Sequence, residues 1–598
     1  MIIKDSMERN YIFPYLKGDF MKWKQRNPEL KTIRDVVMSN NPGVSEEELL
    51  DDKTIYRIKD IDKIINVLND AKIKDIFITV VGDYDADGVT SSSEWDDMLN
   101  RLGIRHRIRL PKRHTEGYGL NINIIDEIDD GILITVDNGI AAIEAIQKAK
   151  DKGLFVIIVD HHQPVIDNDG NKILPNADII IDPHAIDGQA DFVNYCGAGL
   201  TYKIAEELFK ENPSALNRLS CFAAIGTVAD VVELKKDNRK IVKKGLDNLL
   251  VYKSRTTGLG KLLEQCYINK RITADDIGYS IGPAINACGR LGPPIAPKEA
   301  DMAREIISFN GSLTTAESMA KDMIAVNRER QLQVRAADRM AEQIIEDETM
   351  FGEVPLIVYI PDINEGLIGI IAGHLTEKYG VPSIVFTDSH KDITVLKGSG
   401  RSVESVNLKA LLDLCKDDLL GYGGHPGAAG LSIKRDNLDI FREHMQENIG
   451  DYDFEPAELM YDLEIDESEI ETTIEELDKY GPYGQGNPEP IFLIQNYHLY
   501  PKENSMYKVS GSENEHVRFF GLSTFANAFF QNQKYIELGQ PKNMNLIGTL
   551  DVSYFNGTTS YGLKVLDMEA IAEPPKKRTS LAEMVRNKTI QINKEKGL

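Results

Sequence analysis

Short runs of aliphatic and β-branched residues alternate with helical stretches from about residue 76 onward. The stretch GIAAIEAIQKAKDKG at 139–153 carries apolar residues at helical spacing and ends in Gly153. Buried strands that alternate with amphipathic helices are typical of βαβ units, so the pattern predicts a parallel sheet. The runs that predict its strands are IFITVV (76–81), RHRIRL (105–110), ILITV (132–136), LFVIIV (154–159) and ADIII (177–181).

The same reasoning divides the rest of the chain. Residues 190–250 are mostly helical, and a second α/β pattern after 350 contains PLIVYI, PSIVF and the Gly-rich turns GSGRS and GYGGHPGAAG. We expect a helical lead-in at 1–55, a first α/β domain at 56–300, one long connecting helix at 301–350, a second α/β domain at 351–450, a β-rich domain at 451–573 and a mobile basic tail at 574–598.

The composition fits a globular chain of 598 residues and excludes several classes of protein. Five cysteines without a Cys-x-x-Cys pair argue against a disulfide framework and against a zinc knuckle. The N-terminus has no apolar signal-peptide core, and no run approaches the ~18 apolar residues of a membrane span. We therefore expect a protein of the cytoplasm with no membrane association.

The formal net charge of −25 argues against a protein that holds nucleic acid through bulk basicity. A local basic groove can still bind nucleic acid in an acidic protein, and the stretch from Arg105 to His114 contains four Arg, one Lys and two His. The acidic excess also has a plain alternative explanation in solubility.

Acidic side chains directly follow three of the predicted strands. Asp83, Asp85 and Asp87 come after IFITVV, Asp137 comes after ILITV, and the triplet 160–162, Asp-His-His, comes after LFVIIV. The carboxyl ends of parallel strands meet at one edge of a sheet, where such folds bind ligands. Carboxylates gathered there cannot all stay ionised unless cations neutralise them, and mixed carboxylate and imidazole ligands suit Mn²⁺ or Mg²⁺. Two such ions would make a phosphoryl-transfer site, in which one ion activates water and the pair clamps the attacking and leaving oxygens.

Two alternative interpretations compete with a metal site. Any single strand-end Asp is usually a helix N-cap or a turn residue, but several such positions together make that explanation weak. The hexapeptide from Asp83 to Gly88, followed by Glu94, also matches a calcium-binding EF-hand loop. That loop needs an entering helix, whereas the entering segment here is short and β-branched, and the chain holds no second copy. We therefore expect Gly88 to mark a strand-to-helix turn whose helix N-terminus faces phosphate.

The chain resembles the DHH phosphoesterase superfamily in DYDADG (83–88), VDNG (136–139), DHH (160–162) and GTVADVV (226–232). The resemblance extends to the RecJ family of bacterial 5′→3′ single-strand-specific exonucleases. It includes PKRHTEGYGL (111–120), GPAINACGRLG (282–292), GSGRS (398–402), GGHPGAAG (423–430) and GPYGQGNPEPIF (481–492). Nine motifs in the expected order, over about residues 75–495, make this resemblance specific. It implies a DHH domain, a DHHA1 domain after the long helix, and an oligonucleotide-binding (OB)-like β domain at the C-terminal end.

The resemblance also implies roles for the clustered acids and histidines. Two divalent cations, Mn²⁺ or Mg²⁺, are implied as cofactors, with Asp137 bridging them. The implied ligands of one ion are Asp87, Asp137, His161 and Asp230, and those of the other are Asp85 and Asp83. Asp83 would replace a His of small-molecule-cleaving relatives whose position here is Val81. The implied catalytic residues are Asp137, His162, which would contact the scissile phosphate, and Asp160, which would orient a ligand His.

Substrate contacts are implied in the same way. Arg290, Ser399 and Arg401 would grip a terminal 5′ phosphate, for which an Arg fork is suited. Arg113 and Tyr118 would meet the first nucleotides, Tyr118 by stacking on a base. The alternative for Arg113 is an ordinary solvated surface charge, and the alternative for Tyr118 is an ordinary core residue. The other implied contacts are Asn286, Gly423, Gly424 and His425, where glycine lets the backbone approach phosphate.

The function implied is a metal-dependent 5′→3′ exonuclease of single-stranded DNA that releases 5′ mononucleotides in DNA repair and recombination. An alternative is a phosphoesterase of short oligoribonucleotides or nucleotides, although such relatives usually stop after two domains. A remote alternative is an inactive replication scaffold, which would be expected to lose metal ligands. The expected partners are single-stranded DNA and a single-strand-binding protein or helicase, with short RNA as an alternative substrate. We expect the protein to be a monomer. Glu233, where the family usually has Pro, and the polar insert at 164–176 depart from the family pattern.

Overall fold

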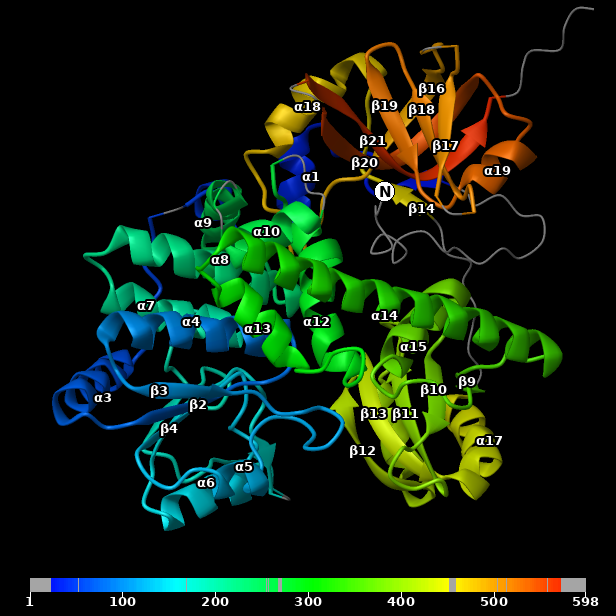
Figure 1. Ribbon diagram of the computed structural model, residues 1–598. Coiled ribbons are helices and arrows are strands. Elements are labelled where there is room, and N and C mark those ends of the chain that lie inside the picture. Colours follow the sequence, from blue (N-terminus) through cyan, green and yellow to red (C-terminus); the bar gives the residue numbers. More distant parts are fainter. Residues whose placement is uncertain are drawn as a thin grey trace, which may run out of the picture.

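The computed structural model describes residues 23–571 apart from 52, 168, 254, 256, 267–270, 451–458, 503, 512, 556 and 557. The predicted basic tail at 574–598 and the first part of the lead-in lie outside these residues. Two α/β units lie side by side, with a β-rich unit above them in Figure 1. The fold class expected from the sequence is therefore confirmed. Among the described residues, no helix is both long enough and apolar enough to cross a membrane.

The first unit is a five-stranded sheet in the order β3-β2-β4-β5-β8, and every neighbouring pair in it is parallel. Its central strands are buried on both faces, which is why they read as continuous aliphatic runs. The strands are β2 (Ile78–Val81), β3 (His106–Arg109), β4 (Ile132–Val136), β5 (Phe155–Val159) and β8 (Ile179–Ile181). The surrounding elements are α3 (Ile61–Lys74), α4 (Ala86–Leu102), α5 (Ile122–Asp126), α6 (Ile143–Asp151), and the hairpin of β6 (Val165–Ile166) and β7 (Lys172–Ile173).

A helical layer covers one face of this sheet and leads into the long helix α14. Glycine allows close packing in this layer, since a Cβ added at Gly245 would lie 2.3 Å from the Cβ of Ala224. The elements are α7 (Gly197–Leu208), α8 (Pro213–Ala229), α9 (Lys236–Lys253), α10 (Gly258–Gln265), α11 (Ala274–Asp276), a π-helix (Ile277–Ile281), α12 (Gly282–Leu291), α13 (Ala300–Ser308) and α14 (Leu313–Asp347). The side chain of Ser312 caps α14, which runs across the molecule to the second α/β unit (Figure 1).

The second unit has a mixed sheet in the order β12-β13-β11-β10-β9, in which only β9 and β10 pair in parallel. Its exposed edge strand is β12, which carries the glycine-rich motif GGHPGAAG into β13. The elements are β9 (Leu356–Tyr359), α15 (Ile368–Tyr379), β10 (Ser383–Asp388), β11 (Val395–Arg401), α16 (Leu408–Leu414), β12 (Leu419–His425), β13 (Ala428–Lys434) and α17 (Leu438–Ile449).

The third unit is a seven-stranded sheet in the order β15-β16-β20-β21-β19-β18-β17. Phe492, Phe519 and Met544 are among its buried core residues. Its elements are β14 (Leu459–Tyr461), β15 (Leu463–Glu464), α18 (Ile470–Leu477), β16 (Phe492–His498), β17 (Tyr507–Ser510), β18 (His516–Phe520), β19 (Thr524–Ala528), α19 (Asn532–Glu537), β20 (Asn543–Phe555) and β21 (Thr558–Ala570).

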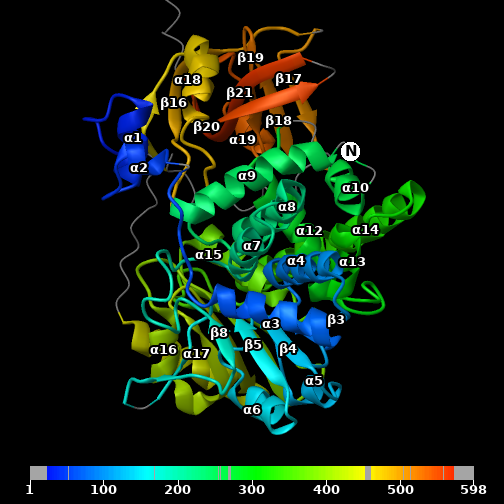
Figure 2. The same ribbon diagram turned by 90° about the vertical axis from the view of Figure 1, so that its left-hand side faces the viewer.

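The N-terminal lead-in belongs spatially to this third unit. Its strand β1 (Trp23–Gln25) pairs in parallel with β14, and its helices are α1 (Ile33–Asn40) and α2 (Glu46–Leu49). Val36 and Leu49 join the apolar core of the third unit, and both views show α1 beside that unit (Figures 1 and 2). The two ends of the described chain are therefore packed together, an arrangement that the sequence pattern did not predict.

Candidate metal centre

The carboxyl ends of β2, β4 and β5 bring the predicted acids and histidines to one edge of the first sheet. The turn after β2 carries Asp83 and Asp85, and Asp87 lies in the first turn of α4. Asp137 follows β4 with a left-handed φ of +59°, and its N–H donates to the carbonyl of Val159 at 3.0 Å. Asp230 arrives from elsewhere in the chain, at the C-terminal end of α8.

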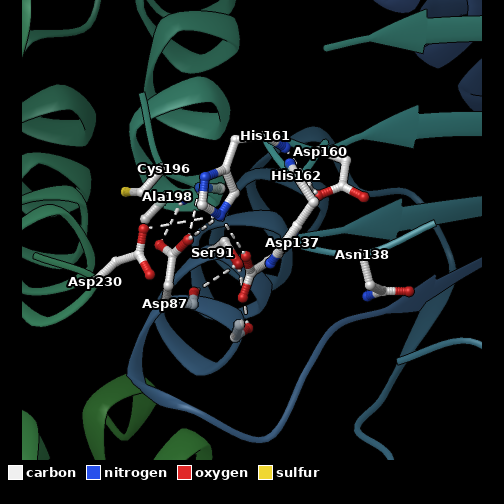
Figure 3. A network of polar contacts seen from close by, with 12 residues as sticks. Asp87, Ser91, Asp137, Asn138, Asp160, His161, His162, Cys196, Ala198 and Asp230 are labelled. Atoms are coloured by element: carbon white, nitrogen blue, oxygen red, sulfur yellow. Dashed lines mark hydrogen bonds and ion pairs between the residues drawn. The ribbon is translucent and has the colours of Figure 1, made fainter. Parts of the chain in front are cut away.

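Asp87, His161 and Asp230 form one group of candidate metal ligands (Figure 3). Nε2 of His161 lies 3.8 Å from Oδ2 of Asp87 and 3.8 Å from Oδ2 of Asp230. The Asp87 carboxylate also accepts the N–H groups of Gly197 at 2.6 Å and Ala198 at 2.9 Å, at the N-terminus of α7. A Cβ at Gly197 would lie 3.0 Å from Asp87 Oδ2, so glycine permits this approach. This arrangement presents two carboxylates and one imidazole to a common point.

Asp83, Asp85 and Asp137 form a second group, with one oxygen of each within 4.8 Å of the others. Asp83 is fully buried; its Oδ1 accepts the Gly119 N–H at 3.2 Å, and its Oδ2 has no hydrogen-bond partner. Asp85 caps α4 by accepting the Gly88 N–H at 3.0 Å, so the N-cap interpretation and the ligand interpretation both hold for it. Asp137 also lies 3.0 Å from Nε2 of His161, which places it between the two groups.

The electrostatics of the cluster fit divalent cations. Burial raises the pKa of Asp137 well above its ordinary value, and the neighbouring charges of Asp87 and Asp85 raise it further. Burial and Asp85 likewise raise the pKa of Asp83, and burial and Asp87 raise that of Asp230. Carboxylates crowded in this way stay ionised when cations neutralise them. The unpartnered oxygen of Asp83 and the mixed oxygen and nitrogen donor set fit Mn²⁺ or Mg²⁺.

Asp160 is buried and holds the ring of His162. Its Oδ1 lies 2.7 Å from Nδ1 of His162, and its Oδ2 accepts the N–H of Ile140 at 2.9 Å. Burial opposes the charge on both groups, but the hydrogen bond and the opposite charges outweigh it. The pKa of Asp160 is therefore lowered, and that of His162 is raised to about 9. The imidazole that Asp160 holds is that of His162, whereas His161 donates only its backbone N–H to Asp160. His162 lies with Asp137 and His161 in a further group of possible metal ligands, so the role of Asp160 in orienting a ligand His stays a prediction.

A row of rings leads from the predicted nucleotide contacts to the cluster. The guanidinium of Arg113 lies over the ring of Tyr84, at 4.9 Å from its centroid. Tyr84 meets the ring of Tyr118 edge to face at 6.3 Å, and Tyr118 meets His162 at 5.7 Å. The Tyr118 hydroxyl donates to the carbonyl of Asp137 at 3.1 Å and lies 3.0 Å from Nε2 of His162. Tyr118 is half-exposed, so its ring is accessible beside the cluster.

Two residues of the site were missed by the sequence analysis. Tyr84, between Asp83 and Asp85, lies in the row of rings, and only its place inside the motif could have indicated this. Asp182 follows β8 at the same sheet edge, and burial together with the charge of Asp160 raises its pKa to about 7. The strand-end rule that found the other acids applied equally to Asp182.

Arg290, Ser399 and Arg401 meet at the start of α15, although α12 and β11 belong to different units. Nη1 of Arg290 donates to the carbonyl of Gly366 at 3.0 Å. A Cβ at Gly369 would lie 3.0 Å from both Ser399 Oγ and Arg401 Nη2. The N-terminal end of α15, which has no side-chain cap, therefore faces two arginines and a hydroxyl, a combination suited to an anion.

Other predicted contacts have local roles. The Asn286 side chain accepts the N–H of Ala86 at 2.8 Å, so it fixes the first turn of α4. Gly423, Gly424 and His425 lie on the edge strand β12, where His425 accepts the N–H of Gly427 at 3.2 Å. At Gly424, with φ of +151°, a Cβ would lie 2.2 Å from the carbonyl oxygen of Ala428, so glycine is required there.

The predicted basic groove at Arg105 to His114 is neutralised in part. Arg105 pairs with Asp75, His106 pairs with Asp96, and Arg109 pairs with Glu116 and Glu127. The strand β3 places these basic side chains next to acids, which a count of charges along the chain does not reveal. The EF-hand alternative also fails, because the entering segment is the strand β2 and the candidate twelfth ligand, Glu94, is fully buried in α4.

Models of three known domain families match the chain. The DHH family N-terminal domain matches residues 77–227, the DHHA1 domain matches 353–451, and the RecJ OB domain matches 461–567. Two of these matches cover the units built around the parallel and mixed sheets, and the third covers the β-rich unit.

Known proteins resemble the chain over most of its length. A single-stranded-DNA-specific exonuclease RecJ from Haemophilus influenzae is 30% identical over 86% of this chain and 91% of its own. The same-named protein of Bacillus subtilis is 34% identical over 70% of this chain, which spans about half (52%) of that relative. The crystal structure of RecJ in complex with Mn²⁺ from Thermus thermophilus has the same fold, with a TM-score of 0.72, 23% identity and coverage of 92% of this chain and 80% of that one.

Proposed function

The chain belongs to the RecJ family of single-stranded-DNA-specific exonucleases, and from this we propose that it removes mononucleotides from the 5′ end of single-stranded DNA by two-metal hydrolysis. The observation that carries the proposal is the pair of ligand groups at the sheet edge. Each offers three donor atoms within 4.8 Å of one another, and Asp137 lies between them. Donors from four separate chain positions meeting in this way favour an enzyme over a scaffold.

We assign Asp87, His161 and Asp230 to one cation, Asp83 and Asp85 to the other, and Asp137 to both. When bound, Mn²⁺ or Mg²⁺ would activate water and neutralise the charge that develops on the phosphate. The protein supplies the rigid carboxylates, held by the N-termini of α4 and α7, so little reorganisation is needed during the reaction.

His162 is the proposed contact of the scissile phosphate. Asp160 keeps its imidazole protonated at neutral pH, so Nε2 carries a hydrogen that can be donated to a phosphate oxygen. In the present structure Nε2 lies 3.0 Å from the Tyr118 hydroxyl. A substrate that enters would take over this donor, while the ring of Tyr118 offers a face for the terminal base.

The proposed binding site of the terminal 5′ phosphate is the cluster of Arg290, Ser399 and Arg401 at the start of α15. Its residues come from two units, so it can fix the end of the strand at a set position relative to the cations. Arg113, over the ring of Tyr84, is the proposed contact of the next nucleotide. We further propose that the protein acts in the cytoplasm as a monomer, in DNA repair and recombination, beside a single-strand-binding protein or a helicase.

A polarity assay tests the proposal. Single-stranded DNA labelled at the 5′ or the 3′ end is incubated with the protein and Mn²⁺. We expect labelled mononucleotide to appear at once from the 5′-labelled strand and only at the end of digestion from the 3′-labelled one. Release in the opposite order, or no release from a free 5′ end, contradicts the proposal.

Substrate length separates this function from the alternative of a short-oligoribonucleotide phosphoesterase. Rates are compared on a dinucleotide and a 20-mer, each as DNA and as RNA, with wild-type protein and Tyr118→Ala. We expect the DNA 20-mer to be preferred, and Tyr118→Ala to weaken its binding because stacking contributes about 1–3 kcal/mol per base. Tyr118→Phe, which keeps the ring, is the matched control. Faster cleavage of the RNA dinucleotide would favour the alternative.

A further inference from the structure

The motif GPYGQGNPEP forms a glycine-rich loop at 481–490, between α18 and β16, which we call the 481–490 loop. Asn487 is fully buried and closes the loop on itself. Its side-chain amide donates to the carbonyls of Tyr480 at 3.2 Å and Pro482 at 3.0 Å. The backbone of Asn487 also exchanges two hydrogen bonds with Gly484, at 3.0 and 3.1 Å. The loop is therefore a rigid feature of the third unit.

The rigid 481–490 loop rests on the segment that leaves the metal centre, residues 231–234. The N–H of Leu234 donates to the carbonyl of Gln485 at 2.8 Å. A Cβ at Gly486, with φ of +74°, would lie 3.0 Å from the Cβ of Glu233. A Cβ at Gly484 would lie 2.8 Å from a methyl group of Leu234. These glycines let the loop lie against the 231–234 segment in a single position.

The 231–234 segment begins immediately after the ligand candidate Asp230. Val231 has a left-handed φ of +61°, which is costly for a β-branched residue, and its side chain is 62% exposed. Contacts further along the chain must hold this conformation, because Val231 itself is not packed. The anchors are Leu234, which is buried, and the carbonyl of Glu233, which accepts from Asn238 at 3.0 Å.

The N-terminal lead-in holds the loop from its other side. Nδ2 of Asn41, the buried C-cap of α1, donates to Oδ1 of Asn487 at 3.0 Å. The Tyr480 hydroxyl, at the start of the loop, donates to Glu46 of α2 at 2.7 Å. Arg239 of α9, next to the 231–234 segment, donates to the carbonyl of Gly481 at 2.7 Å. A continuous set of contacts thus runs from the lead-in through the loop to the chain that carries Asp230.

We propose that the 481–490 loop, locked by Asn487 and Asn41, positions the metal ligand Asp230 through the 231–234 segment. The third unit then has a role in building the metal centre, separate from any role in holding DNA. Asn487 is a positioning residue, since it touches neither the ligand groups nor the proposed substrate contacts among the described residues. The inference rests on the proposed two-metal function, but its main readout is metal binding.

A matched pair of glycine substitutions tests the inference. Gly486→Ala and Gly539→Ala replace glycines of the third unit that have similar left-handed φ values, +74° and +80°. The added methyl group meets Glu233 in the first case and has no atom within 4 Å in the second. We expect Gly486→Ala to weaken Mn²⁺ binding, measured calorimetrically with the metal alone, by about 10-fold, with a similar loss in kcat and little change in KM. Gly539→Ala should lower only the melting temperature.

A second pair removes buried amides instead of adding atoms. Asn487→Ala breaks the loop closure, whereas Gln531→Ala breaks two hydrogen bonds to the carbonyls of Val565 and Leu566 elsewhere in the third unit. We expect only Asn487→Ala to weaken Mn²⁺ binding, with a smaller effect of the same sign from Asn41→Ala. Equal Mn²⁺ affinities across both pairs, or equal losses within a pair, would overturn the inference. Wild-type protein that binds Mn²⁺ without degrading DNA would refute the proposed function alone.

Discussion

Oδ1 of the buried Asp160 lies 2.7 Å from Nδ1 of His162, so one carboxylate controls the charge of the ring that faces the proposed substrate site. This pair carries the first prediction. Asp160→Asn removes the charge that keeps His162 protonated, so the pKa of His162 should fall from about 9 toward 6.5. The alkaline limb of the kcat/KM profile should move to lower pH. Activity at neutral pH should fall about 10- to 100-fold, because His162 loses both part of its protonation and the partner that orients its ring.

Two measurements distinguish a change in the protonation of His162 from a defect in folding or metal binding. The melting temperature of Asp160→Asn and its calorimetric affinity for Mn²⁺ should stay near those of the wild-type protein, because the ring that donates to the Asp160 carboxylate is that of His162, not that of His161. His162→Asn should abolish the alkaline limb altogether. An alkaline limb that stays in place in Asp160→Asn would show that His162 does not govern it.

Asp137 is expected to be indispensable for activity but not for folding. Asp137→Asn keeps the shape of the side chain and removes a charge that burial and the neighbouring acids disfavour. Activity should fall by at least about 100-fold, and calorimetric titration should show that fewer Mn²⁺ ions bind. The metal-free variant should melt no lower than the metal-free wild type. Retained activity with two bound ions would refute a bridging role.

Metal and protons should compete for the cluster, which predicts the pH dependence of stability. In the metal-free protein the pKa values of Asp83, Asp137 and Asp230 are raised above about 3.8, their value in the unfolded chain. Protonation of these acids therefore stabilises the fold fully below about pH 3.8, and this stabilisation is lost as the pH rises. Mn²⁺ binds the ionised form, so the stabilisation by Mn²⁺ should grow with pH, by up to about 1.4 kcal/mol per pH unit for each displaced proton. Thermal melting from pH 5 to 8, with and without Mn²⁺, measures this.

The variant Asp137→Asn serves as the control for that series. It lacks one of the competing protons, so its Mn²⁺-dependent stabilisation should be smaller and should vary less with pH. A stabilisation by Mn²⁺ that is independent of pH in the wild-type protein would contradict the assignment of these acids as ligands.

Arg401 should discriminate between 5′-phosphorylated and 5′-hydroxyl strands. Arg401→Gln removes a charged donor beside Ser399 and Gly369, so KM on 5′-phosphorylated DNA should rise about 10- to 150-fold, corresponding to a charged hydrogen bond of about 1.5–3 kcal/mol. KM on the 5′-hydroxyl strand should change little. Arg105→Gln, which loses only an exposed ion pair with Asp75, is the control. Equal losses on both strands would place the terminal phosphate elsewhere.

The sequence alone was sufficient for the strands and for bringing most of the candidate ligands together. The runs at 76–81, 132–136 and 154–159 are buried parallel strands, and their C-terminal acids meet because parallel strands share an edge. This local rule needs only the order of elements along the chain. The long helix predicted at 301–350 from its length and charge pattern is α14 at Leu313–Asp347, but the first residues of that range form the separate helix α13 (Ala300–Ser308).

Contacts between distant segments could not be predicted in this way. The charges from Arg105 to His114 suggested a basic groove, but neighbouring elements supply acids that pair with Arg105 and Arg109. The side chain of Asn286, whose contact with substrate stays a prediction, accepts the N–H of Ala86, 200 positions away in the chain. The partner of a charged or polar side chain depends on three-dimensional packing, which cannot be read from a count of residue types.

The sequence by itself determined which acids and histidines follow each strand, and residues of these types are suited to two cations. Only the tertiary structure decided how the acids and histidines are held. The lead-in contacts the 481–490 loop, and the loop packs against the 231–234 segment. The side chain of Asp160 is hydrogen-bonded to the ring of His162 rather than to that of His161. The physical reason is that strand order is local information, whereas the hydrogen bond between Asn41 and Asn487 joins positions 446 residues apart and forms only when the whole chain has folded.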